Sequence, residues 1–156
     1  MKSPAVKALP LLVAAIALVY QAVQQMRMDL VYKDARTELG FWGRGDYQPV
    51  PGTLHSTGQA IENLLRLRPA HPDFLGLQAG HAGWLAHWAS DPEASQLYGE
   101  QALQSQYLAL VSRPAHLRSW AKLEGYAARV EDGQTLLLAA RSRIEALTPA
   151  PHKGQL

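Results

Sequence analysis

The sequence has no cysteine, so disulfide bonds, thiolate metal ligands and thiol nucleophiles are excluded. Charge is also scarce, because charged residues make up 18% of the 156 residues, against about 25% in an ordinary soluble domain. The 15 Lys and Arg barely exceed the 13 Asp and Glu, and so small a surplus does not indicate a nucleic-acid-binding protein. Apolar residues are abundant at 47%, which is enough to bury a core, so the chain is not predicted to be disordered. Its length suffices for one domain.

The longest stretch without a formal charge runs from residue 8 to residue 26, between Lys7 and Arg27. It is apolar on all sides, which favours a membrane-spanning helix of about 20 residues over a helix in the core of a soluble domain. A cleaved signal peptide is the other alternative, but the small residues Ala15 and Ala17 lie inside the apolar run, where a cleavage site does not fit. We therefore predict a membrane anchor over residues 1–27.

The positive charges around this segment favour one orientation only weakly. Lys2 and Lys7 favour a cytoplasmic N-terminus, whereas positive residues also follow the apolar run at Arg27, Lys33 and Arg36. We predict a single pass through the inner membrane, with the remaining domain in the periplasm.

Proline and glycine residues divide the rest of the chain into short helical segments. A helix continues the anchor to Leu39, and a loop rich in Gly and Pro follows it. Ser56 and Gln59 form a capping-box pattern, which predicts that the next helix begins there and ends before Pro69. Further helices are predicted over residues 72–90, 92–112, 114–133 and 134–147.

No segment alternates in the manner of a strand, so the predicted fold class is all-α. The predicted organisation is an N-terminal membrane helix followed by a small stack of helical hairpins. Its parts are the anchor (1–27), a helical linker and loop (28–55), a helical-repeat domain (56–149) and a flexible tail (150–156).

An internal repeat supports the stack of hairpins. The segment Arg68-Pro69-Ala70-His71 recurs as Arg113-Pro114-Ala115-His116. Gly80-His81-Ala82 and Gly125-Tyr126-Ala127 follow the two copies at the same distance. Stacked hairpins repeat such signals at equivalent positions. The predicted 72–90 helix also carries glycines, which weaken a helix and so predict that a second helix packs closely against it, at Gly76, Gly80 and Gly83.

These features resemble tetratricopeptide-like helical repeats, and more narrowly the VpsP-type proteins of exopolysaccharide biosynthesis in Gram-negative bacteria. The resemblance implies an accessory protein of polysaccharide production, anchored in the inner membrane, which binds other components and does not transform sugars itself. The residues that carry it are the anchor, Trp42, the segment 65–69, the helix over 84–88, Arg113-Pro114, and the segment 119–123 together with Ala102 and Ala109.

Two sets of side chains are candidates for an interaction surface. Tryptophans at helical spacing are more often core residues, yet aromatic side chains with arginine also form binding hot spots, and sugar rings stack on exposed Trp faces. Arginines near the predicted hairpin ends could meet an acidic partner or an anionic glycan, or they could be solvated surface. The candidates are Trp84, Trp88, Trp120, Arg68, Arg113 and Arg118.

The chemical motifs of enzymes are missing from the sequence. No two histidines are spaced four apart, no HExxH or GxSxG motif occurs, and the acidic residues gather at predicted helix starts or in loops. We predict that His81 is a partly buried, hydrogen-bonded side chain and that Glu124 either snorkels to solvent or forms a salt bridge. No catalytic residue, cofactor or metal site is predicted.

The expected function is therefore that of a non-catalytic, membrane-anchored helical-repeat accessory protein. Its expected partners are inner-membrane proteins of polysaccharide biosynthesis or export and the membrane itself, with a glycan as a further candidate and nucleic acid excluded. The alternative is a small periplasmic glycan-binding protein or an enzyme acting on carbohydrate. Exposed tryptophans beside Glu124 would favour that alternative, and buried tryptophans with an apolar groove elsewhere would favour the accessory protein.

Overall fold

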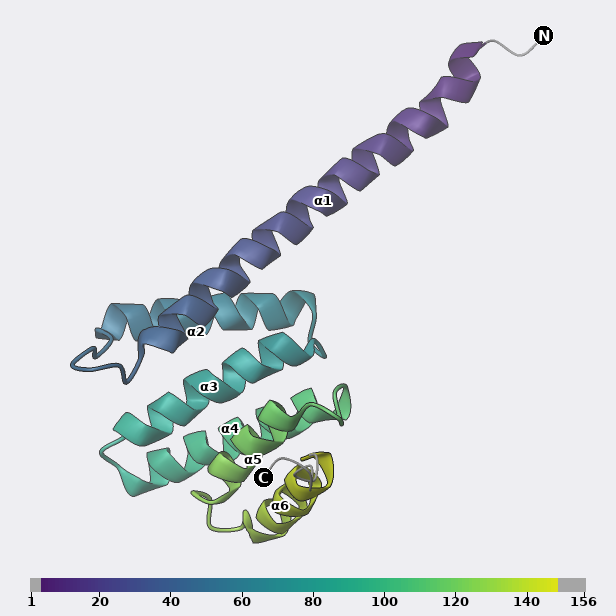
Figure 1. Cartoon of the computed structure of the whole chain (residues 1–156). Helices are drawn as coiled ribbons and strands as arrows, with labels where there is room; N and C mark the ends of the chain where they lie inside the picture. The colour runs from purple at the N-terminus through teal and green to yellow at the C-terminus, as the bar shows by residue number, and fades with distance from the viewer. Residues whose placement is uncertain (1–3, 149–156) are drawn as a thin grey trace, which may run out of the picture.

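The computed structural model describes residues 4–148, so part of the predicted anchor (1–3) and the predicted tail (150–156) lie outside the described residues. The described part contains six α-helices and no strand, which confirms the all-α prediction (Figure 1). The helices are α1 (Pro4–Phe41), α2 (Pro51–Leu67), α3 (Pro72–Trp88), α4 (Pro92–Val111), α5 (Leu117–Ala127) and α6 (Gln134–Leu147).

The N-terminal half of α1 projects away from the other helices (Figure 1). Its large apolar side chains are exposed, from Leu11 at 73% to Met26 at 65%. An apolar helix of this length could cross a membrane, and none of its most apolar window is buried against the protein. This half of α1 is therefore not a core helix, and it has the features of a membrane anchor or a signal sequence.

The C-terminal half of α1 belongs to the folded domain. Ala35 is buried, and Met28, Val31, Tyr32 and Leu39 pack around it on the same face of the helix. The prediction of a helix continuing to Leu39 is confirmed, but this segment is part of the core and not a free linker. Its partners are Ile61 and Leu64 of α2 and Phe74 and Leu77 of α3.

The start of α2 differs from the prediction. The helix begins at Pro51 and not at Ser56, and the amides of Thr53 and Leu54 donate to the carbonyl of Val50 at 2.9 and 3.1 Å. Ser56 lies inside the helix, where its hydroxyl donates to the carbonyl of Thr53. The capping-box prediction is therefore wrong. A proline in the first turn has a helical φ and needs no partner for a backbone N–H, so it starts the helix earlier.

The later boundaries follow the prolines more closely. Asp91 caps α4 as predicted, because its carboxylate accepts a hydrogen bond from the amide of Ala94 at 3.0 Å. The predicted helix over 134–147 is confirmed as α6. In contrast, α5 is shorter than the predicted 114–133, and its start at Pro114 is wrong, because the helix begins at Leu117 after a turn. It ends at Ala127, where Gly133 approaches so closely that a Cβ would overlap the Ala127 backbone.

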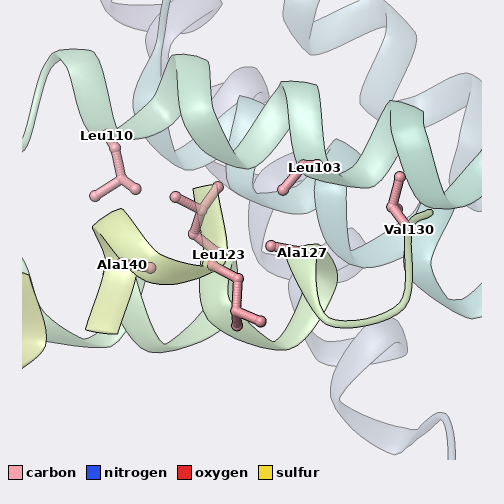
Figure 2. Close-up of a cluster of buried hydrophobic side chains, with 7 residues drawn as sticks. Leu103, Leu110, Leu123, Ala127, Val130 and Ala140 are labelled. Carbon is pink, nitrogen blue, oxygen red and sulfur yellow. The ribbon is translucent and has the colours of Figure 1, made fainter. Parts of the chain in front are cut away.

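The C-terminal half of the domain has its own core. Leu103 and Leu110 of α4, Leu123 of α5 and Ala140 of α6 are buried in one cluster with their neighbours (Figure 2). Between this cluster and the core around α1, helix α3 packs mainly against α4. The interface contains fully buried alanines, which let two helices approach closely. They include Ala79 and Ala82 on α3 and Ala102 on α4.

The two Arg-Pro-Ala-His segments form equivalent turns. In the α2–α3 turn the His71 amide donates to the Arg68 carbonyl at 3.2 Å, and in the α4–α5 turn the His116 amide donates to the Arg113 carbonyl at 3.1 Å. Each turn joins one helix to the next, so the sequence repeat coincides with a repeated local structure.

Candidate binding groove

Two adjoining cavities lie over α3, between α1 and α5. The first has a volume of about 500 Å³ and the second about 410 Å³. They adjoin, because both linings include the same four residues: Arg36 of α1, Gly76 and Leu77 of α3, and Lys122 of α5. We call the combined depression the α1–α5 groove.

The glycines of α3 form the floor of this groove. A Cβ at Gly83 would lie 2.7 Å from the ring of Tyr126 on α5, so the predicted close approach of a second helix is confirmed there. At Gly80 a Cβ would meet only Leu39 at an ordinary 3.8 Å, and at Gly76 it would meet nothing within 4 Å. Gly76 and Gly80 therefore widen the groove and are not required by close packing of a second helix. The prediction of close packing is wrong at these two positions.

The groove is lined by positive side chains. Arg36 of α1 and Lys122 of α5 each line both cavities. The only acidic residue in either lining is Asp73. A concave surface with charge of one sign attracts ligands of the opposite sign. The other basic side chains in the linings are His87, Arg113, His116, Arg118 and Arg129.

Asp73 is itself neutralised by Arg113. The guanidinium donates to both carboxylate oxygens, at 2.6 and 2.9 Å, and so links the start of α3 to the α4–α5 turn. This bidentate hydrogen bonding holds the pKa of the Asp73 carboxyl below its ordinary value. Arg113, predicted as an interaction residue, is therefore a structural ion-pair partner at the edge of the groove.

Replacing Arg113 by Met should destabilise the domain by about 1 kcal/mol at neutral pH, because the pair is only partly shielded from solvent. The folded-state pKa of Asp73 lies below its unfolded value of about 4, so the stabilisation is complete above that value. It disappears as the pH falls through the folded-state pKa. Urea unfolding of both proteins at pH 7 and pH 3 measures this, with Arg143→Met as the control. The same difference at both pH values would contradict the role of the pair.

Gln106 of α4 lines the second cavity and is only 1% exposed. Its side-chain amide donates to the Ser119 carbonyl at 3.0 Å, whereas its Oε1 has no hydrogen-bond partner within the described chain. A buried acceptor without a partner costs about 1–3 kcal/mol.

An aromatic cluster closes the other end of the groove. Trp84 lines the first cavity and stacks on Trp88, with ring centroids 5.1 Å apart. Trp88 in turn contacts Trp42 at 5.4 Å, and Trp42 is the buried member at 3% exposure. The sequence reasoning did not single out Trp42 as a core residue. One signal in the sequence was the glycine that follows Trp42. Gly43 has a φ of 74° and lies against Trp84, so the chain turns closely around this aromatic cluster.

The histidine and glutamate predictions are confirmed. His81 is partly buried, its Nε2 lies 3.2 Å from the Leu54 carbonyl, and burial lowers the pKa of its imidazole. Glu124 accepts a hydrogen bond from Arg141 at 2.9 Å in a salt bridge. Neither group points to chemistry of its own.

The six predicted interaction residues do not form one site. Trp84, Arg113 and Arg118 line the groove, and Trp88 packs behind Trp84. Two others lie elsewhere. The Trp120 ring packs on the core of α4–α6 and donates to the Pro114 carbonyl at 2.8 Å, and Arg68 donates to the side chain of Gln25 on α1 at 2.7 Å.

Arg36, Lys122 and Gln106 were missed by the sequence reasoning. They come from three helices, and no local pattern shows that these helices meet. Across the described side chains, no group of three or more His, Asp or Glu residues could hold a metal ion. In comparisons with known proteins, no family model, no curated protein and no solved structure matches the chain.

Proposed function

We propose that the protein is a non-catalytic, membrane-anchored helical accessory protein that mediates protein–protein contacts in exopolysaccharide biosynthesis or export. The apolar half of α1 anchors it in the inner membrane in a single pass, and the domain lies in the periplasm. The polysaccharide setting rests on the resemblance of the sequence to VpsP-type proteins. The contact function rests on the α1–α5 groove, an open depression beside the anchor helix with basic walls and a glycine floor.

The contacts of the tryptophans favour this function over glycan binding or carbohydrate chemistry. A sugar ring stacks on a broad aromatic face, but Trp88 covers one face of Trp84, which offers only the rest of its ring to the first cavity, and Trp120 packs on a hydrophobic core. Glu124, the acid that the carbohydrate alternative would use, is held by Arg141. All three tryptophans are half-buried, and none forms an exposed platform beside Glu124.

Affinity purification after mild detergent extraction tests the proposal. We expect the wild-type chain to retain inner-membrane proteins of polysaccharide synthesis or export. Lys122→Glu should lose them, because Lys122 lines both cavities of the groove. Arg143→Glu, which reverses an exposed charge on α6 outside the groove, should retain them. Recovery of the wild-type chain alone would overturn the proposal.

A further inference from the structure

We infer that the α1–α5 groove binds an acidic segment of a partner protein in an extended conformation. The inference rests on the proposed docking function and adds the chemistry of the ligand. Three observations carry it: the dimensions of the groove, its glycine floor and its unpaired positive charges.

The groove has the length of a short peptide. Its lining extends along α3 from Pro72 to His87. At 1.5 Å per residue this stretch of helix is ~22 Å long. An extended chain advances 3.3–3.6 Å per residue, so about six or seven residues fill it. The missing side chains at Gly76 and Gly80 leave room for a backbone to lie against α3.

Most basic side chains of the groove have no acidic partner within the described residues. Within residues 4–148, Arg118, Lys122 and Arg129 form no ion pair, whereas Arg113 is neutralised by Asp73. Arg36 approaches from the opposite wall, on α1. Carboxylates spaced along an extended segment can therefore meet positive charge on both sides. Electrostatic complementarity of this kind sets specificity and association rate.

The proposed docking function makes the occupant part of a protein. Acidic side chains of such a segment supply the negative charge that the basic walls of the groove attract. Its backbone can lie against the glycines of the floor.

An acidic oligosaccharide also carries donors and carboxylates, but the aromatic contacts disfavour it. Trp88 covers one face of Trp84, and the ring edge of Tyr126 packs against Gly83, so each ring offers only part of its surface in the first cavity to a sugar. The acidic peptide is therefore the occupant that fits best.

Fluorescence anisotropy on the full chain in detergent tests the inference. The probe is a fluorescein-labelled peptide about eight residues long, in which pairs of adjacent Glu alternate with single Ala, so that its carboxylates point to both sides of an extended chain. The matching Gln and Ala peptide is its control. We expect binding of the acidic peptide at least about tenfold tighter than the control. Lys122→Glu should weaken it about tenfold, since one attraction becomes a repulsion, and Arg143→Glu should leave it unchanged.

Equal affinities for the two peptides, or equal losses in Lys122→Glu and Arg143→Glu, would overturn the acidic peptide as the occupant. Displacement of the peptide by a tetramer of galacturonate at lower concentration than by unlabelled peptide would overturn it in favour of a saccharide. If partners co-purify but the peptide does not bind, the docking function stands and the occupant is wrong. If neither occurs, both proposals fail.

Discussion

Removal of residues 1–27 is expected to move the protein from the membrane fraction to the soluble fraction while leaving the domain folded. The deletion removes the exposed apolar side chains that begin at Leu11 and end at Met26. It keeps Met28 and the part of α1 that packs on α2 and α3. Each Leu, Ile or Val that leaves a bilayer centre gives up about 0.3–0.6 kcal/mol, and a whole helix of them decides the partition. Ultracentrifugation of lysed cells and circular dichroism of the fragment measure both parts of the result.

Deletion of residues 1–41 is the matched control. It also removes Ala35 and its neighbours from the core, so this longer deletion should unfold or aggregate. Precipitation of the shorter fragment would show that residues 1–27 belong to the domain. The mass of the full chain recovered from membranes tests the remaining alternative, because loss of the N-terminal segment would identify it as a cleaved signal sequence.

Trp42→Ala is expected to destabilise the domain by about 3–5 kcal/mol, the usual cost of truncating a fully buried large aromatic side chain. The Trp42 ring lies 5.4 Å from that of Trp88 and 5.6 Å from that of His81, and its Nε1 donates to Glu38 at 2.9 Å. The truncation leaves a cavity at the junction of α1, α2 and α3 and removes the hydrogen bond. Urea unfolding followed by circular dichroism measures the loss.

Phe41→Ala provides the control for this truncation. Phe41 precedes Trp42 in the chain but is 46% exposed, so its replacement should cost about 1 kcal/mol or less. Similar losses in the two variants would show that Trp42 is not a central residue of the core.

The helices could be predicted where a single residue type marks their ends. Pro72 and the Asp91-Pro92 pair lie at the first turns of α3 and α4, and both starts were predicted correctly. At α2 two signals competed, and the earlier one, Pro51, sets the start. The early end of α5 depends on how Gly133 packs against Ala127, which is a contact between segments and leaves no local pattern.

The site was harder to predict than the fold, because it is made by helices that meet in space. Arg113 was identified as a notable residue, but its partner Asp73 is 40 residues away in the chain, so its neutralisation could not be foreseen. Lys122 and Arg36 form the walls only because α5 and α1 lie on either side of α3. The helical spacing of the tryptophans predicted that they would be at least partly buried. It could not predict which face of each ring would be covered.

The unbroken course of α1 from its apolar half to Phe41 limits where a ligand can come from. With the apolar half in a bilayer, the rise from Met26 to Leu39, which lines the groove, is ~20 Å at 1.5 Å per residue. No flexible hinge lies between them, so the groove is held at a fixed height and turns only when the whole helix turns. A segment that reaches it must emerge within a few nanometres of the lipid surface, as a short tail or loop of a neighbouring inner-membrane protein would.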